Sequence, residues 1–157
     1  MTLLQLIRII EFTALKQPTV KTVVENDVFR LNSLPNAQYG VFAWLQGTHS
    51  GNVEDSQQTF AFTFFYVDRL RTDEKNQIEV QSVGCDTLQN ILRTLSDTYD
   101  IDVEDYNITT FNQRFTDVCA GAFATVRLRV PVNSVCMDSL LGDFNLDFSD
   151  DFWRFIL

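Results

Sequence analysis

The sequence predicts an α+β fold, in which a mostly antiparallel sheet carries two helices on one face and a C-terminal extension follows. Three observations favour this class: two amphipathic helical patterns, strand-like segments on both sides of the second one, and one very clear strand, Thr59 to Asp68. Aromatic residues occupy every second position of this strand, which places them on one face. The residues between them, Thr59, Ala61 and Thr63, are small enough for another group to lie close. The aromatic positions are Phe60, Phe62, Phe64 and Tyr66.

The composition is that of an acidic globular domain. The chain has 157 residues, 45% of them hydrophobic, and a net charge of −9. Its pI of about 4.4 argues against a large phosphate-binding surface, because nucleic-acid affinity depends on clustered Lys and Arg. The three cysteines are widely spaced and odd in number, which predicts reduced thiols rather than a disulfide framework. We expect one folded domain over residues 1–131 and a distinct extension over residues 132–157.

The sequence predicts no secretory signal and no membrane partner. The apolar stretch Leu3 to Ile10 is interrupted by Gln5 and Arg8, and no small-residue cleavage site follows it. No run reaches the roughly 18 apolar residues that a membrane span needs.

The first predicted helix runs from Thr2 to Leu15. Thr2 suits the N-cap position, and Pro18 ends the helix because the residue before a proline avoids the helical region. The apolar stripe is broad, so this helix is either deeply buried or shared with a neighbouring subunit. The spacing i, i+3, i+4, i+7 is formed by Leu3, Leu6, Ile7 and Ile10.

Extended segments follow the first helix. Lys21 to Leu34 is strand-like, with a turn predicted at Asn26-Asp27. Tyr39 to Gln46 is a predicted strand rich in aromatic and β-branched residues. The polar segment Gly47 to Ser56 predicts a hairpin loop, from which the aromatic strand Thr59 to Asp68 returns antiparallel.

The second predicted helix runs from Ile78 to Tyr99. Gly84 lies inside its apolar pattern, where it either packs closely against the sheet or breaks the helix. We favour one continuous helix. Its apolar face consists of Ile78, Cys85, Leu88, Leu92, Leu95 and Tyr99.

The remaining elements complete the predicted sheet. Asp100 to Asp105 is acidic and predicts a connector, and Tyr106 to Asp117 predicts a strand or an extended arm. Cys119 to Gly121 predicts a turn or bulge. Ala122 to Val130 alternates as a strand that Pro131 closes, and its small alanines predict a helix against its inner face.

No catalytic, cofactor-binding or metal site is predicted. The single histidine, His49, has no nucleophile motif beside it and is best interpreted as an exposed loop residue. The cysteines lack the spacing of zinc ligands. Asp143, Asn145 and Asp147 match the first ligand positions of a calcium loop, but Phe148 stands where that loop needs glycine.

Charged residues point to a surface for contact between copies of the chain. Arg127 and Arg129 alternate on the exposed side of the last strand, and Arg69 and Arg71 follow the aromatic strand. They form either an ordinary solvated face or a partner for the aspartates of the extension in a head-to-tail contact. The extension combines aromatic and acidic residues and is too apolar to stay solvated, so it docks on its own domain or on a neighbour.

Two segments resemble a known family. Phe62 to Asp97 contains YVDRL at the end of the aromatic strand, then a charged loop and an amphipathic helix, and Thr109 to Pro131 contains CAGAFA. Together they resemble tail-region proteins of phages and prophages of gut Bacteroidales, including crAss-like phages. The resemblance spans Asp27 to Pro131. The element order is also similar to that of tail-terminator and tail-completion ring proteins of long-tailed phages, a likeness of fold only.

The resemblance implies a structural virion protein without catalysis or cofactors, assembled in the host cytoplasm. Its subunits would form a hexameric or dodecameric ring in the neck or tail and contact portal, connector or tail proteins. DNA would pass through without specific binding, which suits a net charge of −9. Besides the loop Arg69 to Asn76, the candidate contact residues are Leu3, Ile7, Ile10, Arg69, Arg71, Arg127, Arg129, Asp143, Phe144, Phe148, Asp150, Phe152, Trp153 and Phe155.

Two other function classes stay open. A small acidic inhibitor or DNA mimic of phage origin would need carboxylates spaced regularly over one surface, whereas here they cluster in two connectors and the extension. A hydrolase would need His49 or an acidic pair inside a pocket.

Overall fold

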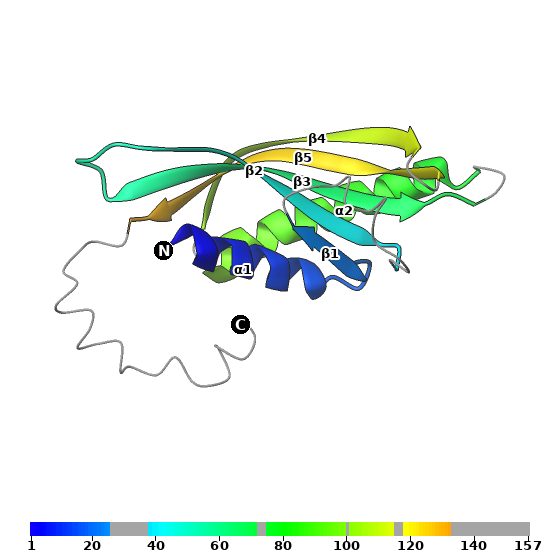
Figure 1. The fold of residues 1–157 in the computed structure, drawn as a ribbon, viewed down its shortest axis with the longest axis horizontal. Coiled ribbons are helices and arrows are strands. Elements are labelled where there is room, and N and C mark those ends of the chain that lie inside the picture. Colours follow the sequence, from blue (N-terminus) through cyan, green and yellow to red (C-terminus); the bar gives the residue numbers. More distant parts are fainter. Residues whose placement is uncertain (26–37, 72–74, 100, 115–117, 133–157) are drawn as a thin grey trace.

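The computed structural model describes residues 1–25, 38–71, 75–99, 101–114 and 118–132. Two helices and five strands follow one another along the chain (Figure 1). In chain order they are α1 (Leu3–Leu15), β1 (Thr22–Glu25), β2 (Val41–Gly51), β3 (Gln57–Arg69), α2 (Gln77–Tyr99), β4 (Asp102–Arg114) and β5 (Val118–Pro131).

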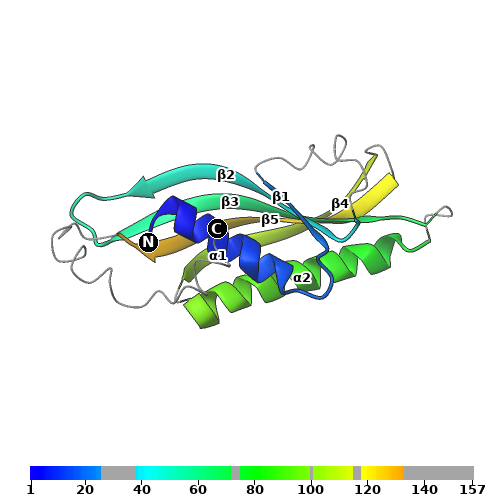
Figure 2. The same cartoon turned by 60° about the horizontal axis from the view of Figure 1, so that its bottom comes forward.

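The strands form one sheet in the order β1-β2-β3-β5-β4. β1 and β2 are parallel, and the other neighbouring pairs are antiparallel. Both helices lie on the same face of this sheet (Figure 2). The predicted α+β class, with a mostly antiparallel sheet and two helices on one face, is therefore confirmed.

The ends of α1 follow from its sequence. Thr2 is the N-cap: its hydroxyl accepts from the Gln5 amide N–H, and the Gln5 side chain accepts from the Thr2 amide N–H. This reciprocal pair satisfies two backbone groups that a helix start leaves unpaired. The helix ends at Leu15, three residues before Pro18. Both the start and the stop were predicted correctly.

The aromatic face of β3 forms the centre of the core. Phe60, Phe62, Phe64 and Tyr66 are 3% exposed or less, and all four belong to the cluster that both helices cover. Phe64 packs against Phe42 of β2, with ring centroids 5.4 Å apart, and Phe62 packs against Trp44 at 6.2 Å. Aromatic pairs at these separations stabilise beyond the area they bury.

The helix α2 continues unbroken through Gly84, as predicted. The sheet comes very close to the helix at this residue, which explains why it is a glycine. A Cβ atom at Gly84 would lie 3.1 Å from the Tyr66 ring and 3.2 Å from the Ala122 amide nitrogen. Ala122 and Ala124 are fully buried on the helix side of β5, so the small residues of both elements allow this approach. The expected helix against the alanines of this strand is thereby found.

Several predicted boundaries were wrong. β2 continues to Gly51 through a bulge between Gln46 and His49, so the first part of the predicted loop Gly47 to Ser56 is strand. β4 begins at Asp102, inside the predicted acidic connector. Ile78 is 78% exposed and does not belong to the buried face of α2.

The predicted turn or bulge at Cys119 to Gly121 was also wrong. These residues pair in continuous register with Arg69, Asp68 and Val67 of β3. A Cβ atom at Gly121 would run into the backbone carbonyl of Tyr66, so glycine here permits close strand approach rather than a turn. The predicted turn at Asn26-Asp27, the rest of Lys21 to Leu34 beyond β1, and the extension beyond Val132 lie outside the described residues.

Replacing Gly84 with valine tests the contact between α2 and the sheet. The added side chain must push the helix away from Tyr66 and Ala122, so Gly84→Val should lower the free energy of unfolding by about 2 kcal/mol in urea titrations. Ser82→Val, an exposed position of the same helix, serves as the control and should cost less than about 0.5 kcal/mol. Equal stability of the two variants would show that α2 does not rest this closely on the sheet.

Candidate interaction surface

The face of the sheet opposite the helices is the surface with the strongest functional interest. Side chains alternate along β3 and β5, so the residues between the buried aromatic and alanine positions point to this open face. No helix of the described part of the chain covers it (Figures 1 and 2).

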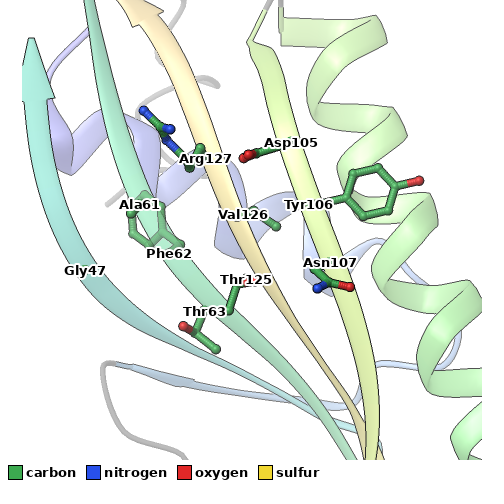
Figure 3. Close-up of a pocket in the computed structure, with 10 residues that line it drawn as sticks. All are labelled: Gly47, Ala61, Phe62, Thr63, Asp105, Tyr106, Asn107, Thr125, Val126 and Arg127. Carbon is green, nitrogen blue, oxygen red and sulfur yellow. The ribbon is translucent and has the colours of Figure 1, made fainter.

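A groove of about 330 Å³ crosses the middle of the open face (Figure 3). Its floor consists of two rows of paired residues from β3, β5 and β4. One row is Ala61, Arg127 and Asp105, and the next is Thr63, Thr125 and Asn107. Gly47 of β2 lines the groove next to Ala61. The small residues expected to leave room on this side of β3 do so.

One end of the open face is charged. Arg127 and Arg129 point outward as predicted, and their side chains pair with β4 of the same chain. Glu104 lies 3.5 Å from Arg127 and 3.2 Å from Arg129, and Asp102 lies 3.3 Å from Arg129. Because these pairs are partly solvated, each contributes little to stability. A carboxylate from another molecule would have to compete with them.

The other end of the open face is aromatic. Phe123 of β5 lies between Phe65 of β3 and Phe111 of β4, with ring centroids 5.9 and 6.3 Å away. Phe65 and Phe111 pack against a small second cluster that includes Val67 and Cys119, both fully buried. The groove therefore separates a charged end from an apolar end.

The candidate contact residues of the N-terminal helix α1 differ in how deeply they are buried. Ile10 is 1% exposed and packs in the core of its own chain, which corrects its assignment as a contact residue. Leu3 and Ile7 are partly buried against the same cluster. The apolar residues that α1 exposes are instead Leu4, at 63%, and Leu15, at 54%.

The remaining contact candidates lie in two places. Arg69 ends β3 with its guanidinium 5.9 Å from the Tyr39 ring, and Arg71 pairs with the exposed Glu79 at 3.3 Å. The loop that carries Arg71 is described only up to that residue and again from Lys75. The candidates of the extension lie outside the described residues: Asp143, Phe144, Phe148, Asp150, Phe152, Trp153 and Phe155.

His49 was predicted in a loop but lies in β2. Its ring stacks on Phe60, with centroids 4.3 Å apart, and its Nε2 atom lies 2.9 Å from Gln58 Oε1. Among the described residues, no three His, Cys, Asp or Glu side chains gather closely enough to hold a metal ion. Cys119 is buried, and burial together with the charge of Asp86 raises the pKa of the half-buried Cys85 thiol.

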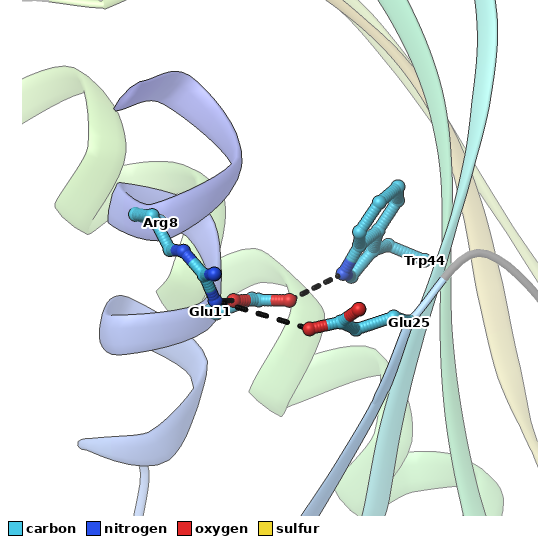
Figure 4. Close-up of polar contacts among 4 residues, drawn as sticks. All are labelled: Arg8, Glu11, Glu25 and Trp44. Carbon is cyan, nitrogen blue, oxygen red and sulfur yellow. Dashed lines mark hydrogen bonds and ion pairs between the residues drawn. The ribbon is translucent and has the colours of Figure 1, made fainter. Parts of the chain in front are cut away.

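A polar cluster under α1 was not predicted from the sequence. The carboxylate of Glu11, 8% exposed, accepts from Trp44 Nε1 and from Arg8 Nη1, both at 3.1 Å (Figure 4). Arg8 also lies 3.8 Å from Glu25 of β1. The cluster therefore ties α1 to two strands. The sequence did contain a signal for the burial of Glu11. It follows Ile7 by four residues and therefore lies next to Ile7 on the partly buried side of the helix.

A second set of buried polar residues joins the loop after α1 to the sheet and to α2. The Tyr66 hydroxyl donates weakly to the Thr19 carbonyl and lies near Asp68, both at 3.4 Å, and the Thr19 and Thr87 hydroxyls are 2.7 Å apart. Burial, reinforced by the charge of Asp68, raises the pKa of Tyr66. Both buried groups are satisfied within the chain, so we assign them to the fold rather than to a reaction.

No protein-family model matches the chain, and no curated protein is significantly similar to it. Neither helix in the described part of the chain combines the length and apolar character that crossing a bilayer requires.

Removing the Glu11 carboxylate tests the polar cluster. Glu11→Ala leaves Trp44 Nε1 buried without its acceptor and takes from Arg8 its closest partner, so the free energy of unfolding should fall by about 3 kcal/mol. Glu25→Ala, which removes the more distant and exposed partner of Arg8, should cost less than about 1 kcal/mol. Both variants are compared with the unsubstituted chain by urea unfolding followed through tryptophan fluorescence. A Glu11→Ala variant as stable as Glu25→Ala would contradict the buried clamp.

Proposed function

We propose that this chain is a structural subunit of a phage neck or tail and assembles with copies of itself into a ring around the DNA channel. The observation that supports this most is the architecture. Residues 27–131 resemble phage tail-region proteins, and the element order is similar to that of tail-terminator and tail-completion proteins, which are α+β subunits that assemble into rings. The chain has this architecture, and its element order is helix, three strands, helix, two strands.

The open face supplies the contact area that such a subunit needs. It combines an apolar end, at Phe65, Phe111 and Phe123, with a groove and a charged end. Stable interfaces combine buried apolar anchors with polar groups at the rim. A ring requires a heterologous contact, in which two different surfaces of the subunit meet. The exposed Leu4 and Leu15 of α1 offer a second apolar surface on the opposite side of the sheet.

The charge distribution fits a channel through which DNA slides. A net charge of −9 repels phosphate, so the lumen would not bind DNA tightly. The same charge is less suited to a DNA mimic, because Asp102 and Glu104 are partly neutralised by Arg127 and Arg129. The structural role is therefore the better supported of the two phage functions.

The native mass of the purified chain tests the ring. We expect a mass several times the 18.1 kDa of one chain, alone or together with neck and tail proteins of the same phage, and we expect the chain in purified particles of that phage. A strict monomer under both conditions, absent from the particles, would overturn the proposal.

A variant of the groove tests which surface carries the contact. Thr125→Trp places a large side chain on the groove floor and should weaken assembly at least about tenfold, measured as the concentration at which the mass falls to that of one chain. Thr98→Trp, at an exposed position near the end of α2, is the matched control and should assemble normally. Normal assembly of Thr125→Trp would show that the groove lies outside the interface.

A further inference from the structure

β4 presents a long strand edge without a described partner. It pairs with β5 from Asp102 to Arg114, and no strand of the described residues pairs with its other side. An edge strand directs half of its backbone N–H and C=O groups outward, where they can pair with another extended segment. At the opposite side of the sheet, β1 is only four residues long.

The middle of this edge lacks the features that usually prevent pairing. Acidic residues and a bulge occur only at its start, between Asp102 and Asp105. From Tyr106 to Asn112 the strand has no charged residue, no proline and no bulge. Charges, prolines and bulges are the usual means of protecting an exposed edge. The stretch Tyr106 to Asn112 is therefore the part of the edge that can accept a strand.

A groove of about 310 Å³ lies beside the start of this edge, between α2 and β4. Its apolar lining consists of Leu92, Val103 and Tyr106, and its polar lining of Gln89, Arg93, Ser96 and Asp97. Tyr106 is 50% exposed. A strand added to β4 would direct every second side chain to the helix side of the sheet.

The segment 144–148 has an alternating sequence that suits this edge. Phe144, Leu146 and Phe148 alternate with Asn145 and Asp147. In a strand added to β4, the apolar residues would face the helix side of the sheet and the polar residues would face the open side. There they would lie near Asn107 and Thr109, and the acidic start of β4 would not oppose Asp147.

The chain can bring this segment to its own edge. β5 ends at Pro131, and Arg129 pairs with Asp102 at the start of β4, so the chain leaves the sheet one strand away from the free edge. Residues 132–143 can span up to about 40 Å when fully extended. A tether of this length gives a local concentration in the millimolar range, which favours the chain's own edge over that of another copy.

We propose that residues 144–148 pair with the outer edge of β4 of the same chain, between Tyr106 and Asn112. They extend the sheet by one strand and place Phe144, Leu146 and Phe148 on the helix side of the sheet. This contact forms within a single chain and does not require the ring.

Hydrogen exchange of the full chain tests whether the edge is occupied. Replacing Phe144, Leu146 and Phe148 together by Asp should speed exchange of the outward-facing amides between Tyr106 and Asn112 by at least about tenfold. Replacing Phe152, Phe155 and Leu157 by Asp adds the same charge outside the pairing segment and should leave these amides unchanged. Unchanged exchange in the first variant, or equal acceleration in both, would overturn the proposal.

Disulfide trapping identifies which chain supplies the strand. In a background with Cys85→Ala and Cys136→Ser, Thr109→Cys is combined with Asn145→Cys or Asp147→Cys and oxidised. A crosslinked single chain on a non-reducing denaturing gel supports the proposal, and crosslinked dimers would overturn it in favour of a neighbouring copy. Thr48→Cys on β2 replaces Thr109→Cys in the control, and equally efficient crosslinking there would also overturn it. Since the gel separates chains that are not covalently joined, its result is independent of whether the ring exists.

Discussion

The close contact between α2 and the aromatic face of β3 is the constraint on which the rest of the structure depends. Gly84 allows the helix backbone to rest against Tyr66 and Ala122, and no larger residue fits without displacement. This contact fixes the depth of the core and lets both helices pack on the same side of the sheet. The close approach of β3 and β5 depends on a second glycine, Gly121, which lies against the backbone of the same Tyr66.

One consequence is an asymmetric sheet. Both helices cover one face, so the other face and the edge at β4 can be covered only by a partner or by other parts of the chain. The open face contains a groove over small residues, with aromatic residues at one end and ion pairs at the other. A surface of this kind suits a protein whose function is assembly, which agrees with the structural role that we propose.

Two of the less exposed carboxylates of this acidic chain are paired with neighbouring side chains. Glu11 is buried, where the indole of Trp44 and the guanidinium of Arg8 satisfy its carboxylate. Glu104 lies between two arginines of the neighbouring strand. Each of these carboxylates has a specific cationic or hydrogen-bonding partner in the fold, since an unpaired charge at a buried position would be costly. The net charge of −9 therefore does not imply unpaired carboxylates at these positions of the fold.

The sequence by itself determined the α+β class, both helices and the aromatic strand, because the periods of 3.6 and 2 are local properties of the chain. Only the tertiary structure decided the features that depend on neighbouring strands. Asp102 to Asp105 looked like a solvated connector because its arginine partners are distant in sequence, and Gly121 looked like a turn because its close neighbour is the backbone of Tyr66. Ile10 looked available for a partner until α1 was placed on the sheet. The groove is likewise a product of register, since Ala61, Arg127 and Asp105 meet only when three strands align.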